Sequence, residues 1–410
     1  MLQKIINLLI NLVALSLPLY LIRFEIYSWP TNLLELIILV LFIVWLVSKI
    51  RSEAPQFKEA AFFYPVFLIF FGLTLATLFS TDLRISAGVW KSWFIVPWLY
   101  FIVLIDVLRS KKQVIRLLTA LTLSGLGIAL VAFGYWANNL LTYDGRLKAL
   151  YLSPNHLAMF LSPILILSFY LYFCLKKNIH KIILFIVHCS LFAVIYLTYS
   201  YGAWLGLLAG FIFLSIIFYR KRTRLNRPKF IFSVLGLIFL IFVSVCLNQA
   251  PGQKFQGLVG LSYPSLESRL IIWQSAWTII KDHPLLGIGP GLFQKYYLDY
   301  QSQALPYLEW AVPQPHNLFL AFWLQTGLLG LLGLLWLLVR FFRNFSRPGA
   351  NSSLKPEIKK GSQLLKYFLL AAMIYLLVHG FIDTTYWKND LSVIFWLLIA
   401  LNYRAGRCAC

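Results

Sequence analysis

The chain has 410 residues, of which 60% are hydrophobic and 12% are charged, and its formal net charge is +22. An ordinary soluble domain has about 45–50% apolar and about 25% charged residues, so this chain has too little polar surface for a soluble fold. The positive charge does not indicate binding to nucleic acid, because Lys and Arg fall in short clusters between apolar runs. The composition therefore predicts a polytopic membrane protein that contacts lipid.

Apolar runs long enough to cross a bilayer recur along the whole chain. A transmembrane helix needs roughly 20 mostly apolar residues to cross about 30 Å of hydrocarbon. Twelve runs meet this criterion, at approximately residues 5–23, 31–48, 61–79, 89–107, 114–135, 155–175, 180–199, 202–219, 229–247, 316–341, 364–381 and 391–403. We expect an all-α polytopic protein with a single integral membrane domain over residues 1–410.

The loops between these runs alternate in their content of Lys and Arg. Basic residues concentrate in alternate loops, at residues 49–58, 109–116, 176–181, 220–229 and 340–366. Basic loops stay on the cytoplasmic side of a membrane, so both chain termini are predicted to be cytoplasmic. The intervening loops, including the long segment 248–315, then face the periplasm or the cell exterior.

The long outward segment 248–315 is predicted to contain structure of its own. Ser265 can cap a helix that begins at the next residue, and Pro284 ends it. Arg269 and Trp273 recur at helical spacing, and Arg269 shares the apolar side of this helix. An amphipathic helix that merely covers the bundle explains the apolar stripe equally well, but it does not explain the position of the cation.

Two further segments favour irregular backbone. The glycines at 287–291 follow no strand and lack the Lys-Ser/Thr pair of a phosphate-binding loop, so they predict a tight turn. Residues 340–366 are rich in Ser, Pro, Gly and Asn near their centre and predict a flexible cytoplasmic linker.

His316 is the first candidate for chemistry, because it follows Pro313-Gln-Pro315 where an apolar run begins, with Asn317 beside it. Histidine is the side chain best suited to accept a proton near neutral pH. A histidine at a membrane boundary can also be a helix-start or interfacial residue, so the position alone leaves both interpretations open.

Cations on the outward side are few, and Arg269 and Arg146 are the candidates for binding phosphate. The guanidinium fork matches pairs of phosphate oxygens, although an interfacial arginine can also extend its charge to water. The outward acids show no paired Asp-x-Asp spacing that would hold a divalent cation. We therefore expect neither a metal nor another cofactor.

Several stretches together resemble the superfamily of O-antigen ligases and O-antigen polymerases, which are membrane glycosyltransferases. They are Pro154-Asn155-x-x-Ala158, Ser268-Arg269-x-x-x-Trp273, the segment from Pro284 to Phe293, Pro315-His316-Asn317 followed by Gly327-x-x-Gly330, and His379-Gly380-x-x-Asp383. The resemblance covers roughly residues 145–401. It implies a bundle of the GT-C type with one long structured periplasmic loop, in a bacterial inner membrane.

The resemblance also implies a reaction. The family moves a glycan from a polyprenyl pyrophosphate, such as undecaprenyl pyrophosphate, to an acceptor hydroxyl, and lipid A core is the acceptor of the ligases. Polymerases and protein O-oligosaccharyltransferases of the same superfamily are alternatives. The implied catalytic residues are His316 and Arg269, and the implied substrate-binding residues are Arg146, Tyr201, Asn155, Asn317 and Trp273.

One position departs from the family pattern. Thr198-Tyr-Ser200-Tyr201-Gly202 resembles a segment in which an arginine commonly follows the serine and helps to bind pyrophosphate, and this chain has Tyr201 there. A tyrosine donates one hydrogen bond and carries no charge at neutral pH. Arg146 is the residue that we expect to supply the missing charge.

Two other classes of protein compete with an enzyme. A transporter or flippase for a lipid-linked solute predicts charges near mid-membrane and an internal repeat, whereas here Glu35 and Asp106 are the acidic residues within runs, both near run ends or isolated, and no repeat is evident. A non-catalytic scaffold for envelope assembly would fit the substitution at Tyr201. The resemblance implies an inverting, metal-independent glycosyltransferase, and the transporter and the scaffold remain its alternatives.

Overall fold

The computed structural model describes residues 2–27, 29–50, 60–220, 264–301, 312–346 and 356–405. Most of these residues are helical, and a two-stranded hairpin is the one sheet that they contain. Eight of the described helices are long and apolar enough to cross a membrane, and two further apolar helices are shorter. The predicted all-α polytopic fold is confirmed. The expected span at 229–247 lies outside the described residues.

The first half of the chain contains most of the described helices. In chain order the elements are α1 (Leu2–Leu15), η1 (Leu17–Leu21), β1 (Arg23–Ile26), β2 (Trp29–Asn32), α2 (Leu33–Ile50), α3 (Ala60–Leu78), α4 (Leu83–Val89), the π-helix η2 (Trp90–Ile95), α5 (Val96–Val107), α6 (Lys111–Ala137), α7 (Pro154–Cys174), α8 (Asn178–Leu197) and α9 (Tyr201–Arg220). The second half contains α12 (Pro264–Asp282), α13 (Phe293–Tyr300), α14 (Leu318–Ser346), α15 (Pro356–Gly380) and α16 (Asn389–Ala405).

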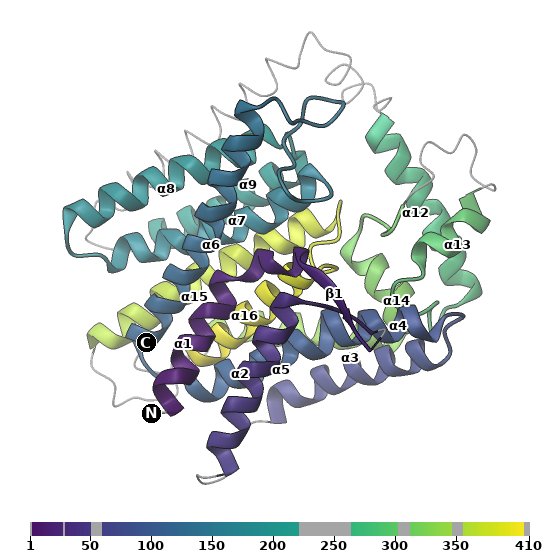
Figure 1. Cartoon of the computed structure of the whole chain (residues 1–410), viewed down its shortest axis with the longest axis horizontal. Coiled ribbons are helices and arrows are strands. Elements are labelled where there is room, and N and C mark those ends of the chain that lie inside the picture. Colours follow the sequence, from purple (N-terminus) through teal and green to yellow (C-terminus); the bar gives the residue numbers. More distant parts are fainter. Residues whose placement is uncertain are drawn as a thin grey trace.

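Two helices form the centre of the bundle. Every residue of α16 from Asn389 to Asn402 is buried, and α7 is buried along almost its whole length. A helix that is apolar on all sides belongs in the interior, which fits both sequences. Figure 1 shows α15 and α16 between the group α6–α9 and the group α12–α14. The candidate site lies where these groups meet.

The first predicted span, 5–23, is not one continuous helix. Helix α1 ends at Leu15, and Leu17–Leu21 form a 3₁₀ turn that contains Pro18, whose ring cannot continue an α-helix. The chain then forms the hairpin β1–β2, in which Arg23 pairs with Asn32. The hairpin was not predicted, because its short strands have no clear alternation of apolar and polar residues.

Two predicted loops contain helix. The outward loop expected at 81–88 begins α4, because the Asp82 side chain accepts a hydrogen bond from the Ile85 nitrogen and caps the first turn. The expected linker 340–366 is shorter than predicted, since α14 continues to Ser346 and α15 begins at Pro356. Residues 347–355 of the expected linker lie outside the described ranges.

Small residues bring α9 against α15. A Cβ atom on Gly206 would lie 2.9 Å from the Tyr375 carbonyl oxygen, and one on Gly210 would lie 2.9 Å from that of Ala371. One turn earlier, a Cβ atom on Gly202 would lie 2.5 Å from Cδ2 of His379. This row of small residues permits the close helix packing that is common in membrane proteins. It fixes the start of α9 beside the end of α15.

Helix α14 is interrupted at Gly327, where the backbone has φ 69° and ψ −179°. The predicted tight turn at 287–291 is confirmed, with positive φ at its three glycines, and the segment that leads into it fills the interruption. The nitrogen of Ile288 donates to the Leu324 carbonyl at 2.7 Å, and the nitrogen of Leu328 donates to the Leu285 carbonyl at 2.9 Å. These two backbone hydrogen bonds hold the segment that contains Leu285 and Ile288 against α14.

Candidate functional site

The site is built around the residues that lead into α14. Asn317 caps this helix, because its side-chain oxygen accepts hydrogen bonds from the nitrogens of Phe319 and Leu320 at 2.9 and 3.0 Å. Its amide nitrogen donates to the Phe381 carbonyl at 3.0 Å. Asn317 was predicted to bind substrate, and here both ends of its amide hold backbone. It ties the start of α14 to the segment that follows α15.

His316 precedes this cap in an unusual backbone conformation. Its φ is 46°, in the left-handed region that residues other than glycine seldom occupy. The indole nitrogen of Trp273 donates to the His316 carbonyl at 3.3 Å, so α12 holds the histidine from the other side. This bond makes Trp273 a support for His316, and its predicted contact with substrate stays a prediction.

The imidazole of His316 pairs with a carboxylate that lies 67 residues later. Nδ1 of His316 is 3.1 Å from Oδ1 of Asp383, and the two side chains are 28% and 4% exposed. An ionised carboxylate accepts hydrogen bonds and cannot donate one, so Nδ1 carries the proton in this contact. In the neutral ring Nε2 is then left as a proton acceptor.

Asp383 is held in its ionised form by its surroundings. Burial raises the pKa of Asp383, but the charge and hydrogen bond of His316 and the charges of His379 and Arg269 outweigh burial, so this pKa lies well below its ordinary value. The Thr384 nitrogen also donates to Oδ1 at 2.8 Å. The carboxylate is therefore charged at any pH at which His316 could act as a base.

Arg269 is the cation beside this pair. It lies on α12, which begins at Pro264 and ends at Asp282, close to the predicted helix, although Ser265 falls inside the first turn instead of before it. Its Nε atom is buried and has no hydrogen-bond partner among the described residues. A buried N–H without a partner costs about 1–3 kcal/mol, and a charged group costs more. Within the described residues, this Nε–H group is therefore free to donate a hydrogen bond to an acceptor.

A second arginine reaches the same carboxylate through an asparagine. One terminal nitrogen of Arg146 donates to Oδ1 of Asn155 at 2.6 Å, and the amide nitrogen of Asn155 donates to Oδ2 of Asp383 at 2.9 Å. The Nε atom of Arg146 donates to the Thr198 carbonyl at 2.8 Å. Arg146, Asn155, Asp383 and His316 thus form one continuous chain of hydrogen bonds.

Tyr201 lies at the edge of this network. It is half-buried as the first residue of α9, three residues after Thr198, which accepts the bond from Arg146. The next residue, Gly202, contacts the ring of His379, whose Nδ1 is 2.8 Å from the Tyr375 hydroxyl. The loop that carries Arg146 therefore meets the segment that carries Tyr201.

The sequence missed Asp383 as the partner of His316, and it gave His379 no role. Both lie in the stretch His379-Gly380-x-x-Asp383, so the signal was present, but no local pattern indicated which residue the carboxylate would face. Together the residues offer a proton acceptor, a carboxylate to stabilise the resulting cation, and two guanidinium groups. This combination is suited to a transfer reaction with an anionic leaving group.

Comparison with known proteins agrees with this chemistry. A family described as O-Antigen ligase matches residues 185–335, a range that includes Tyr201, Arg269, Trp273 and His316. A curated protein named O-antigen ligase, from Salmonella typhimurium strain LT2, is 24% identical over 391 residues, which cover 90% of each chain. Both similarities support a place for this chain in the O-antigen ligase superfamily, and with it a multi-pass membrane enzyme that transfers glycans in lipopolysaccharide biosynthesis.

Proposed function

We propose that this protein transfers a glycan from an undecaprenyl pyrophosphate donor to a hydroxyl group of lipid A core, without a metal ion and with inversion at the anomeric carbon. The observation that carries the proposal is the buried Nε atom of Arg269, unpartnered among the described residues, beside the His316–Asp383 pair. A cation and a base placed together match the two charges that change during such a transfer.

The proposed reaction is a single displacement. The acceptor oxygen bonds to the anomeric carbon from the face opposite the pyrophosphate, and the bond from that carbon to the pyrophosphate oxygen breaks with its electron pair. The hydroxyl proton passes to Nε2 of His316, and Asp383 stabilises the imidazolium that forms. Arg269 offers its guanidinium to the pyrophosphate as negative charge develops there.

Arg146 is proposed as the second contact of the pyrophosphate. Its position supports this role, because it bonds to Thr198, three residues before the tyrosine that replaces the family arginine. Its bond to Asn155 also lets a bound phosphate affect Asp383, since Asn155 contacts that carboxylate. Tyr201 would donate one hydrogen bond in place of the missing guanidinium.

The active site is proposed to face the periplasm, with both termini in the cytoplasm. The basic clusters support this orientation, since Lys111 and Lys112 begin α6, and the loop that carries Arg146 follows the other end of the same helix. In a cysteine-free background, Tyr143→Cys should react with an impermeant thiol reagent in intact cells, and Lys112→Cys should not. The reverse labelling pattern would overturn the orientation.

The function is tested with purified protein in lipid nanodiscs. A synthetic undecaprenyl pyrophosphate glycan is offered with lipid A core, with a free copy of the glycan, or with a Ser/Thr peptide, in the presence of a chelator. We expect transfer to lipid A core, unaffected by chelation, with an inverted linkage by NMR. Transfer only to the glycan or only to the peptide would reassign the acceptor, and loss of transfer on chelation would contradict the metal-independent mechanism.

A further inference from the structure

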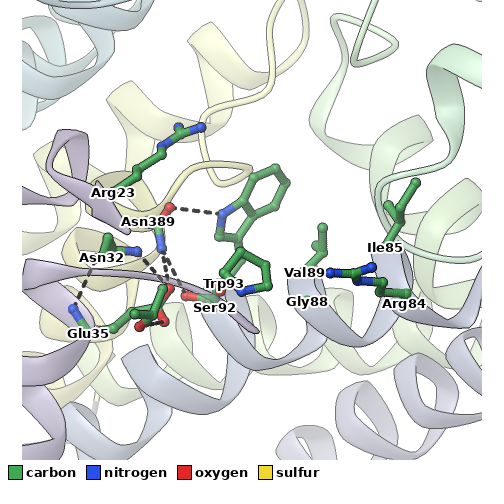
Figure 2. A pocket seen from close by; sticks show the side chains of 12 residues that line it. Arg23, Asn32, Glu35, Arg84, Ile85, Gly88, Val89, Ser92, Trp93 and Asn389 are labelled. Atoms are coloured by element: carbon green, nitrogen blue, oxygen red, sulfur yellow. Dashed lines mark hydrogen bonds between the residues drawn. The ribbon is translucent and has the colours of Figure 1, made fainter. Parts of the chain in front are cut away.

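An open pocket lies on the hairpin side of the bundle. Its volume is about 320 Å³, and it is lined by β1, β2, the start of α2, α4, η2 and the start of α16 (Figure 2). The side chains and backbone that line it belong to Arg23, Pro30, Thr31, Asn32, Glu35, Arg84, Ile85, Gly88, Val89, Ser92, Trp93 and Asn389. None of the residues proposed for the transfer reaction is among them.

The acid in the lining of this cavity is already neutralised. Glu35 is buried, and Lys91 forms an ion pair with it at 2.9 Å. Its two carboxylate oxygens also accept hydrogen bonds from Asn32 at 2.7 Å, Thr31 at 3.1 Å and Asn389 at 3.1 Å. The carboxylate therefore fixes the walls of the cavity and has little capacity left to bind a ligand or to repel an anion.

The remaining charges in the lining are positive. Figure 2 shows Arg23 and Arg84 on opposite sides of Trp93, and both arginines are exposed. Lys388 does not line the pocket but lies near it, with Nζ 5.9 Å from the centre of the Trp93 ring. A cavity with two guanidinium groups and an indole is suited to a phosphorylated sugar.

The cavity is connected to the transfer site through one short segment. The indole nitrogen of Trp93 donates to Asn389 at 3.1 Å, and its ring packs edge-on against Trp387 at 5.9 Å between centroids. Trp387 and Asn389 follow Asp383 by four and six residues. The same segment therefore forms a wall of the cavity and presents the carboxylate that pairs with His316.

We propose that this cavity binds a phosphate group on the sugar of the acceptor glycolipid and so positions the acceptor hydroxyl toward His316. The inference rests on the proposed transfer function and adds the chemistry of acceptor recognition. Ligand pockets in proteins have volumes of about 300–1,000 Å³, so this cavity is large enough for a sugar ring with its phosphate. Arg23 and Arg84 grip the phosphate, and Trp93 packs on the sugar face.

The test compares two forms of one acceptor, lipid A core before and after treatment with phosphatase, in neutral nanodiscs with saturating donor. The wild-type KM should be about tenfold lower for the phosphorylated acceptor. Arg23→Gln and Arg84→Gln should each raise that KM several-fold, without changing kcat, the donor KM or the KM of the dephosphorylated acceptor. The control is Arg109→Gln, at a side chain that is 72% exposed and pairs with Asp106 outside the cavity.

Two results would overturn the proposal. Equal KM values for the two acceptors in wild type and in both variants would show that the cavity does not bind the acceptor phosphate. A KM shift that follows the anionic phospholipid content of the nanodisc, and not the phosphorylation of the acceptor, would assign the cavity to a lipid headgroup instead.

Binding is measured separately from transfer, so that a failure of the proposed transfer function can be distinguished from a failure of the proposed anion site. Calorimetric titration of the His316→Asn protein with the phosphorylated, deacylated core oligosaccharide should give a Kd that Arg23→Gln weakens about tenfold. If wild type transfers nothing yet this titration behaves as expected, the proposed function fails and the anion site stands. No weakening in the Arg23 variant would reject the site itself.

Discussion

Two histidine–aspartate pairs lie close together in this molecule and differ mainly in their access to water. His316 and Asp383 are 3.1 Å apart with side chains 28% and 4% exposed, and His156 and Asp390 are 3.1 Å apart with side chains 2% and 0% exposed. The separations are the same, so the chemical capacity of each pair depends on whether a substrate can reach it. We expect chemistry from the open pair and structural stabilisation from the sealed one.

The sealed pair is enclosed by aromatic side chains. The Tyr20 hydroxyl is 3.4 Å from Nε2 of His156, and the Tyr151 ring is 4.5 Å from the histidine ring between centroids. His156 follows Asn155 directly, so neighbouring residues of α7 contact the two aspartates. The sealed pair therefore helps to fix the position of α7 relative to the segment that carries Asp383.

The largest expected effect follows from removing the open histidine. His316→Asn should lower the transfer rate about 10³-fold, because general bases contribute about 10²- to 10⁴-fold and asparagine cannot take the proton. Asparagine tolerates the left-handed backbone at this position, so the melting temperature should stay near that of wild type. Transfer kinetics and thermal unfolding of the same preparation test both statements, and His180→Asn at an exposed position is the control.

The sealed histidine should show the opposite pattern. His156→Leu leaves the buried Asp390 without its partner, and breaking a buried pair in this way costs about 3–5 kcal/mol. We expect a large loss of thermal stability in detergent, while the protein that remains folded retains its transfer rate within a few-fold. A stable His156→Leu protein that has lost transfer would reverse the roles of the two pairs.

Arg269 is a further difference between the two pairs, because its positive charge acts on Asp383 of the open pair and lowers the pKa of that carboxyl group. Arg269→Ala should reduce kcat about 10²-fold, the usual size of the loss when one group that stabilises a developing anion is removed. Arg269→Lys should recover little, because an ammonium cannot bind two phosphate oxygens side by side. Lys281→Ala, at an exposed position near the end of the same helix, should retain activity.

The smallest effect concerns the pH dependence of stability. The lowered pKa of Asp383 means that its ionised form stabilises the folded protein, fully above its unfolded pKa of about 3.9 and progressively less as pH falls toward the folded pKa. Asp383→Asn should therefore unfold more easily than wild type at neutral pH, and the difference in unfolding free energy should shrink as pH falls below about 4. A difference that stays the same from about pH 5 to about pH 3 would show that a group other than the Asp383 carboxylate controls it.

Hydropathy predicted most of the fold, because each span must be apolar over a length fixed by the bilayer. Eleven of the twelve predicted runs coincide with described helices. The hairpin after Leu21 and the interruption at Gly327 escaped prediction, since an average over a window does not register where single backbone groups bond. Pro18 and the helix cap at Asp82 are recognisable in the sequence, but the average hydropathy of the surrounding residues determined the predicted boundaries.

The site was predicted in part for a similar reason. His316 is a polar residue at the start of an apolar run, and Arg269 is a cation on the apolar side of its helix. The family resemblance strengthened the prediction that both residues are catalytic. Their meeting with Asp383 depends on how the end of α15 packs beside the start of α14, which no residue spacing encodes. Asn155 was expected to bind substrate, whereas in the structure it connects Arg146 to that carboxylate.

The interruption of α14 at Gly327 has a consequence for how the protein is made. The Leu324 carbonyl and the Leu328 nitrogen would bond to each other in an unbroken helix, and here they bond to Ile288 and Leu285. A backbone group without a partner in hydrocarbon costs several kcal/mol, so α14 is not a finished unit when it leaves the translocon. The segment that contains Leu285 and Ile288 is synthesised just before α14 and must already lie beside it when the helix enters the membrane. Membrane insertion of α14 is therefore coupled to assembly of the active site.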